Sequence, residues 1–311
     1  GGLGMGLAGA CALHMELGRA LATVPFLPAL LAVDAISQGE LADREDWLAR
    51  LTAGEDYVAA PLADSALTVA SGAGGELTLA GRAVAVPSAD RASHVLICAT
   101  AGNCVALVPL EREGVKIIAC PTWDETRRLF ELEFDAVLLE PQLTLASGSA
   151  ARVLCRKLAV QRDFALAADA VGGAAALLEL TVDYLQTREQ FGRPLALFQA
   201  LKHRCADLKA QTEGAQALLL DNLGRLDERL GDAATLAGAE RLGRAAKQLG
   251  CAAYAAVAEE ALQLHGGIGM TSEHGCHRYL KRAMLNEHLG GPYENYDVEL
   301  AANLLDGIKI N

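Results

Sequence analysis

The chain has 311 residues, 52% of them hydrophobic and 21% charged, so it can bury a large core and is not intrinsically disordered. Its 39 acidic and 27 basic side chains give a net charge of −12 with no run of Lys and Arg, which argues against nucleic acid as a partner. Polar residues interrupt the apolar stretches before they reach the roughly 18 residues of a membrane span, so we expect no membrane segment.

The cysteine pattern indicates a reducing compartment. Eight cysteines stand mostly inside apolar runs, and none forms a C-x-x-C pair. This pattern predicts buried free thiols rather than disulfides, and neither a zinc site nor any other metal site. We therefore expect a cytoplasmic protein. The chain begins Gly1-Gly2 without an initiator Met, so we also expect that its true start is missing.

The N-terminal part of the chain predicts helices, and the middle part predicts a β region. Leu13, Leu17 and Leu21 follow a helical spacing, whereas apolar and acidic residues alternate over 130–135 as in a half-buried strand. Gly102-Asn103 predicts a hairpin and hence antiparallel pairing. The predicted strands cover residues 77–86, 94–100, 104–110, 115–120 and 130–135.

The last 170 residues contain only two of the nine prolines, Pro194 and Pro292, and are rich in Ala and Leu. Few prolines and a helical periodicity predict long helices. The predicted helices cover residues 146–187, 195–228, 233–265 and 273–306. The predicted order is therefore helical over 1–54, antiparallel β over 55–143 and four helices over 144–311, so we expect an α+β fold.

Two segments in the helical part carry groups suited to a nucleotide. The first, R-x-x-F-G-R-P followed by F-Q-A-x-K-H-R, joins two predicted helices and offers the guanidinium of Arg188 and the ring of Phe191. By spacing alone, an ordinary helix hairpin explains this segment better than a nucleotide-binding site does. The second, Q-L-H-G-G-x-G, ends a helix in glycines that either allow a ligand close to the backbone or serve as a simple C-cap. His265 within it is interpreted as structural.

Taken together, the helical–β–helical order and these two segments resemble the acyl-CoA dehydrogenase family over nearly the whole chain. The resemblance implies that residues 1–54 are the rest of an N-terminal helical domain, 55–143 a middle β domain and 144–311 a C-terminal four-helix bundle. It also implies FAD as cofactor, an acyl-CoA substrate and an electron-transferring flavoprotein as electron acceptor. In that family the two segments hold the adenine and pyrophosphate half of an FAD whose flavin ring lies on a neighbouring subunit. The matching residues are Arg188, Gln190, Phe191, Phe198, Gln199, Gln263, Leu264, Gly266 and Gly267.

The family's catalytic base, however, has no counterpart. The reaction removes the α-proton of the thioester with a carboxylate, so a positioned Glu is needed. Gly290 occupies the usual base position, and Gln161, just before the possible substrate-binding Arg162, occupies the position used by other members. A one-residue helical offset turns a side chain by about 100°, so we expect Asp163 to face elsewhere. No catalytic residue is therefore predicted in this chain.

A chain with nucleotide-binding residues but no catalytic base resembles one subunit of the heteromeric α2β2 acyl-CoA dehydrogenases of bacterial steroid side-chain degradation. The resemblance implies that a homologous subunit supplies the catalytic Glu and that the acyl group is bulky. Two alternatives remain open. One is a self-sufficient homotetramer in which Asp163 or Glu287 acts as the base, and the other is a related scaffold that binds no cofactor.

Overall fold

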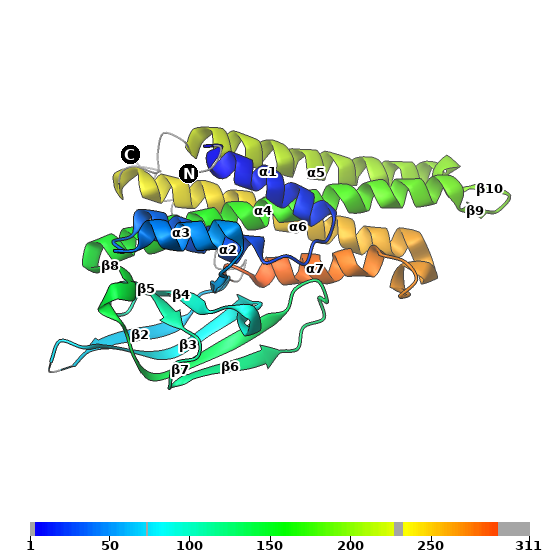
Figure 1. Cartoon of the computed structure of the whole chain (residues 1–311). Helices are drawn as coiled ribbons and strands as arrows, with labels where there is room; N and C mark the ends of the chain where they lie inside the picture. Colours follow the sequence, from blue (N-terminus) through cyan, green and yellow to red (C-terminus); the bar gives the residue numbers. More distant parts are fainter. Residues whose placement is uncertain (1–3, 73, 227–232, 292–311) are drawn as a thin grey trace, which may run out of the picture. The chain divides into compact units, whose positions relative to one another are not determined.

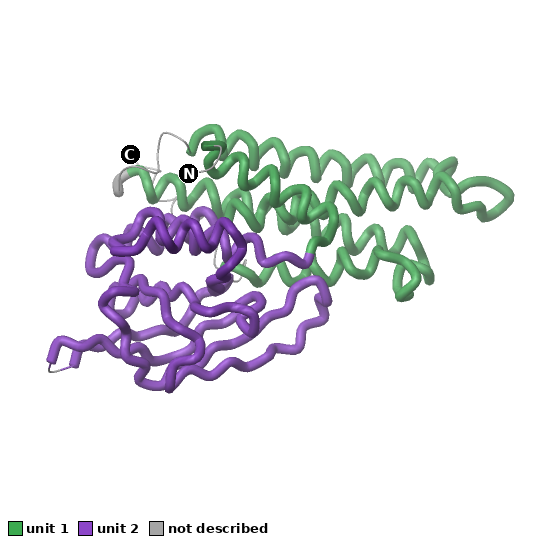
Figure 2. Tube along the Cα trace, in the orientation of Figure 1, with its two compact units in different colours: residues 1–22, 163–311 green, residues 23–162 purple. Residues whose placement is uncertain are grey.

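The computed structural model describes residues 4–72, 74–226 and 233–291. Its contacts divide the chain into two compact units (Figure 2). Residues 23–162 form one, here the sheet unit, and residues 1–22 with 163–311 form the other, here the bundle unit. The three-domain assignment with boundaries at 54 and 143 stays a prediction.

The sheet unit begins with two helices, α2 (Phe26–Gln38) and α3 (Arg44–Ala53), followed by two four-stranded sheets (Figure 1). The first sheet has the order β1-β4-β5-β8 and the second the order β2-β3-β7-β6. The strands are β1 (Val58–Ala59), β2 (Ala66–Ser71), β3 (Leu77–Pro87), β4 (His94–Ala99), β5 (Cys104–Pro109), β6 (Val115–Cys120), β7 (Leu129–Leu138) and β8 (Thr144–Ser147).

The predicted hairpin and the alternating strand are both confirmed. Gly102 and Asn103 have φ values of 102° and 47°, the left-handed backbone that a tight hairpin turn requires, and β4 pairs antiparallel with β5 across them. In β7, Phe130, Leu132 and Phe134 are buried and join the core that the sheets share, while the acidic residues between them are more exposed. Among the named strands of the sheet unit the pairing is antiparallel except for β1, which pairs parallel with β4, and an isolated parallel bridge joins Thr68 of β2 to Ala101. The strands β1, β2 and β8 were not predicted from the sequence.

The bundle unit contains α1 (Gly6–Arg19) and the helices of the C-terminal part, α4 (Gly148–Thr187), α5 (Gln199–Leu226), α6 (Ala233–His265) and α7 (Cys276–His288). The first residues of α4, up to 162, belong to the sheet unit. Small residues let these helices approach closely: a Cβ on Gly172 would lie 2.0 Å from the backbone oxygen of Met15 in α1. The predicted α+β fold with a C-terminal four-helix bundle is confirmed.

A buried ion pair joins α4 to α7 inside the bundle unit. Arg282 donates to both carboxylate oxygens of Asp169, at 3.1 and 2.5 Å, and Asn286 donates to the same carboxylate at 2.7 Å. All three side chains are buried, so each buried charge has a charged or polar partner. A third donor of Arg282 reaches the carbonyl oxygen of Ala22, 2.9 Å away, which ties the residues after α1 to α7.

Two sequence-based expectations are wrong. The helix predicted over 273–306 ends at His288, because Gly290 and Gly291 take left-handed φ values of 81° and 105°; residues 292–306 lie outside the described part. We also expected no segment long and apolar enough to cross a membrane, yet α4 meets that criterion by length and composition. Most of its apolar window, 72%, is buried inside the protein, as in the core helix of a soluble protein.

Candidate functional site

The link between α4 and α5 is a small hairpin that presents an aromatic ring. Strand β9 (Glu189–Gln190) pairs antiparallel with β10 (Arg193–Pro194), and the turn between them holds Phe191 at φ 57° and Gly192 at φ 77°. A left-handed backbone is unfavourable for a side chain as large as Phe191. Its side chain is also 89% exposed, so neither burial nor local backbone preference within this chain explains an aromatic residue here.

The predicted nucleotide-binding residues of this segment lie around that hairpin. The rings of Phe191 and Phe198 meet edge to face at 6.0 Å, and the guanidinium of Arg193 lies 4.0 Å above the ring of Phe198. Arg188, Gln190 and Gln199 are exposed. Within the described part of the chain, Arg188 has no carboxylate partner. Its guanidinium is thus available for an anion, a role that stays a prediction.

The second predicted segment ends α6 and continues as a short 3-10 helix, Gly266–Met270. Leu264 is buried, whereas Gln263, Gly266 and Gly267 are exposed. Gly266 has a left-handed φ of 62°, but Gly267 does not, and a Cβ built on either glycine would have no atom within 4 Å. Packing inside this chain therefore does not require Gly267 to be a glycine. Open space over a bare backbone fits a bound group that approaches closely.

Tyr184 and His265 bring the two segments to the same end of the bundle unit (Figure 1). The ring of Tyr184 stacks on that of His265 at 4.5 Å, and its hydroxyl donates to the backbone oxygen of His265 at 3.3 Å. His265 is buried, and burial is the main cause that lowers its pKa. The Nδ1 of this ring lies 2.7 Å from the carbonyl oxygen of Ala261 and donates to it, a contact that raises the pKa and so opposes the effect of burial.

Neither expected base position carries a carboxylate, and at each position the structure shows a physical reason for the residue that is present. Gly290 takes a φ of 81°, a backbone conformation that is strained for any residue with a side chain. Gln161 is tied to α2: its Nε2 donates to Oδ2 of Asp34 at 2.5 Å. Position 290 therefore favours glycine through its backbone, and position 161 favours an amide through its neighbour.

Asp34 is the centre of a polar cluster that the sequence did not predict. Besides Gln161, Gln38 donates to its Oδ2 at 2.6 Å, and Lys157 donates to Oε1 of Gln38 at 3.2 Å. Burial raises the pKa of Asp34, while the hydrogen bonds from Gln161 and Gln38 and the charge of Lys157 lower it. Asp34 and Gln161 are 127 positions apart, and no motif connects them, so only the fold could show this pair.

The other candidate residues lie in different surroundings. The Arg162 side chain is only 12% exposed and forms an ion pair with Asp64 at 3.5 Å, within the sheet unit. Asp163 is buried and faces α6, since its Cβ lies 3.5 Å from where a Cβ on Gly243 would be. Glu287 in α7 is half-buried, and burial is the main cause that raises its pKa.

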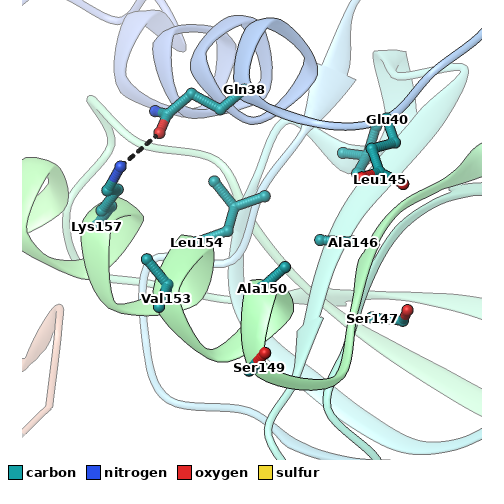
Figure 3. A pocket seen from close by; sticks show the side chains of 10 residues that line it. All are labelled: Gln38, Glu40, Leu145, Ala146, Ser147, Ser149, Ala150, Val153, Leu154 and Lys157. Atoms are coloured by element: carbon teal, nitrogen blue, oxygen red, sulfur yellow. Dashed lines mark hydrogen bonds between the residues drawn. The ribbon is translucent and has the colours of Figure 1, made fainter. Parts of the chain in front are cut away.

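A cavity of about 420 Å³ lies in the sheet unit between the end of α2, β8 and the start of α4 (Figure 3). Its walls combine apolar side chains such as Leu154 with Lys157, Gln38 and the hydroxyls of Ser147 and Ser149. None of the site residues predicted from the sequence is among its lining residues. Within the described residues there is also no group of three or more His, Cys, Asp or Glu that could hold a metal ion.

The comparisons with known proteins now decide the family. Residues 151–304 match the C-terminal domain of acyl-CoA dehydrogenases. Over 284 residues the chain is 34% identical to the acyl-CoA dehydrogenase IpdE2 of Mycobacterium tuberculosis, covering 91% of this chain and 73% of that protein. The chain belongs to the acyl-CoA dehydrogenase family. This family is FAD-dependent, so the predicted cofactor is confirmed at the level of the family.

Solved structures of similar proteins agree with this family assignment. A steroid acyl-CoA dehydrogenase, the Tcur3481-Tcur3483 G363A variant, superposes with a TM-score of 0.86 at 28% identity, covering 99% of this chain and 83% of that chain. The ChsE4-ChsE5 complex from Mycobacterium tuberculosis gives the same TM-score at 24% identity, with coverage of 97% and 81%. At that identity, the second comparison shows the fold alone.

Proposed function

We propose that this chain is the non-catalytic subunit of a heteromeric, cytoplasmic, FAD-dependent acyl-CoA dehydrogenase that acts on a bulky acyl-CoA thioester of the steroid side-chain type. It supplies the adenine and pyrophosphate half of the FAD site, while a homologous partner in an α2β2 assembly supplies the catalytic Glu. An electron-transferring flavoprotein then takes the electrons.

The absence of a carboxylate at both base positions carries this proposal. Removing an α-proton requires an acceptor within hydrogen-bond reach of it. Gly290 offers no side chain, and Gln161 offers an amide whose nitrogen already donates to Asp34. A carboxamide does not accept a proton at neutral pH, so neither position supplies the acceptor, and in this proposal the acceptor comes from another chain.

The residues at the end of the bundle unit fit the nucleotide half of FAD. Arg188 and the exposed backbone at Gly266 and Gly267 would hold the pyrophosphate, because a guanidinium and open N–H groups suit a dianion. Phe191, together with Phe198, would contact the adenine, which accounts for a ring that this chain leaves exposed. Bound FAD supplies the hydride acceptor of the dehydrogenation.

The similar proteins support a paired subunit and a bulky substrate. One similar structure is a steroid acyl-CoA dehydrogenase whose name joins two proteins, and another is a complex of two differently named proteins. If this chain pairs in the same way, the exposed Phe191 end becomes an interface in the assembly.

The direct test is to purify the chain alone and together with a homologue from the same organism that has a Glu at either base position. We expect the chain alone to be inactive with acyl-CoA, and the co-purified complex to hold FAD and to turn over substrate. A chain that holds stoichiometric FAD and oxidises acyl-CoA unaided would overturn the division of labour.

The raised pKa of Glu287 favours a second candidate, the self-sufficient homotetramer with a relocated base. Two variants, Glu287→Gln and Asp163→Asn, distinguish this homotetramer from the heteromeric complex, because Glu287 and Asp163 are the two candidate bases of this chain. The homotetramer predicts that one of these variants loses activity while its assembly and FAD content are unchanged. Our proposal predicts that neither amide abolishes the activity of a complex that still assembles.

A scaffold without cofactor is a third possibility, which the open space above Gly267 and the exposed Phe191 disfavour. The absorbance of the purified complex decides it. A flavin band that weakens when Arg188 is replaced with Ala excludes the scaffold, and a colourless complex with the partner present would favour it.

A further inference from the structure

Tyr184, in the last turn of α4, contacts both predicted nucleotide-binding segments at once. Its backbone oxygen accepts the N–H of Arg188 at 2.8 Å. Its side chain contacts His265, which is 81 positions away and directly precedes the glycine segment, here residues Gly266–Met270. A single residue therefore joins the backbone of Arg188 to the start of the glycine segment.

The side-chain contact between Tyr184 and His265 is mainly a ring stack. The two ring centroids lie 4.5 Å apart at an interplanar angle of 24°. The bond from Nδ1 of His265 to the carbonyl oxygen of Ala261, at 2.7 Å, fixes the orientation of the imidazole. The hydroxyl of Tyr184 lies 3.3 Å from the backbone oxygen of His265, which is long for an O–H···O bond. The ring thus contributes more to this contact than the hydroxyl does.

A third ring holds the other end of the glycine segment. His274 follows this segment in the chain, and the centroid of its ring lies 4.4 Å from that of His265 and 6.1 Å from that of Tyr184. The Nδ1 of His274 accepts the N–H of Cys276, the first residue of α7, at 3.2 Å. Both flanks of the glycine segment are therefore held against Tyr184 of α4.

The groups that would meet the pyrophosphate lack such support of their own. Arg188 is exposed and, in the part of the chain that the structure describes, pairs with no carboxylate. Gly266 and Gly267 are exposed, and a Cβ on either would have no atom within 4 Å. Two groups that bind one rigid anion need a fixed separation, because any freedom between them is lost on binding and weakens affinity. In this chain, that separation depends on the residues that flank the two groups.

We infer that Tyr184 is a positioning residue for FAD. It does not contact the cofactor, but it fixes the backbone of Arg188 relative to the glycine segment, so that both reach the pyrophosphate together. The inference rests on the proposed placement of the nucleotide half of FAD at these two segments. It holds whether a homologous partner or this chain supplies the catalytic base, because Tyr184 acts on cofactor binding alone.

Two substitutions separate the role of the ring from that of the hydroxyl. Tyr184→Phe keeps the stack on His265 and loses only the long hydroxyl contact, so FAD release should accelerate at most about threefold. Tyr184→Leu removes the stack and should accelerate FAD release about tenfold. The release is followed by flavin fluorescence after dilution of the FAD-loaded protein, which is the complex or, if the chain alone holds FAD, the chain.

Tyr279 in α7 provides a matched control. It is a half-buried tyrosine of the same bundle unit, and its hydroxyl donates to a backbone oxygen, that of Arg19, at 2.7 Å. Tyr279→Leu should lower the midpoint of urea unfolding about as much as Tyr184→Leu does, but it should leave FAD release unchanged. At saturating added FAD, Tyr184→Leu should regain the kcat of the wild type, because no reacting group has changed.

The possible outcomes separate this inference from the proposed function. Equal FAD release in Tyr184→Leu and Tyr279→Leu would overturn the inference, because a general loss of stability would then explain the effect. If Tyr184→Leu does not fold, His265→Leu removes the same stack from α6, and wild-type FAD release in that variant would also overturn the inference. A wild-type complex that holds no FAD would instead refute the proposed cofactor placement, and the positioning role with it.

Discussion

The contact between Gln161 and Asp34 makes one substitution especially informative. Gln161→Glu replaces the amide, whose nitrogen lies 2.5 Å from the Asp34 carboxylate, with a second carboxylate. The charge-assisted hydrogen bond that is lost is worth about 1.5–3 kcal/mol. Two like charges in contact add to this loss, so we expect the free energy of unfolding to fall by about 3–5 kcal/mol at pH 8.

The loss should depend on pH with a defined sign. Below the raised pKa, a single shared proton restores a hydrogen bond between the two carboxyl groups, as in other close carboxyl pairs. The folded protein then binds more protons than the unfolded chain, whose carboxyl groups titrate near pH 4, so stability falls as the pH rises through the raised pKa. At pH 5 we expect the difference from wild type to shrink to about 1 kcal/mol.

Urea denaturation at pH 5, 7 and 8 measures this effect, and two variants serve as controls. Gln161→Met removes the donor without adding charge, so its loss should change less between pH 5 and pH 8. The exchange Asp34→Asn with Gln161→Glu keeps one carboxylate, one amide and their hydrogen bond, and should recover most of the stability. A pH-independent loss in Gln161→Glu, or an exchange variant as unstable as that single variant, would refute the reasoning.

Three further predictions follow from particular contacts. Arg188→Ala should weaken FAD retention in the complex about tenfold or more, measured by flavin release, while the unfolding midpoint of the chain stays unchanged. Gly267→Ala should likewise leave stability unchanged but reduce FAD content, whereas Gly173→Ala should cost about 1–3 kcal/mol in urea denaturation, because its Cβ would lie 2.5 Å from a buried tyrosine ring. Arg282→Met should lower the free energy of unfolding by about 3–5 kcal/mol, since it leaves Asp169 buried without its charged partner; a loss below about 1 kcal/mol would contradict that account.

Local sequence signals predicted much of the fold because the physics behind them is local. The helix over 233–265 is uninterrupted by proline, and the Gly102-Asn103 turn needs a left-handed backbone, so both were predictable from neighbouring residues. Strands β1 and β8 contain only two and four residues, too few for an alternating pattern. The end of α7 at His288 depended on two adjacent glycines that the helical periodicity around them concealed.

The candidate site divides in the same way. The nucleotide-binding segments are short motifs, and the sequence shows them directly, although the meeting of Tyr184 with His265 that places them at one end of the bundle unit required the fold. The sequence did not reveal the Asp34 cluster, because Asp34 and Gln38 lie on α2 whereas Lys157 and Gln161 lie on α4, and all four are ordinary helix residues. A polar pair across two helices has no spacing rule that a single sequence could reveal.

The two base positions lack a carboxylate for different physical reasons, and this difference bears on how readily the chain could become self-sufficient. At Gly290 the obstacle is the backbone: a Glu there would have to adopt a φ near 81° or unmake the turn after α7. At Gln161 the obstacle is one neighbouring side chain, which a second substitution removes. If the partner supplies the base, the exchange of Asp34 and Gln161 is the shorter route to a carboxylate within this chain. The exchange variant should then show slow exchange of the substrate α-proton with solvent deuterium when the partner's own Glu is replaced with Gln. The control is the complex in which this chain is unchanged and the partner's Glu is replaced with Gln. If the exchange variant is no faster than this control, position 161 does not reach the substrate.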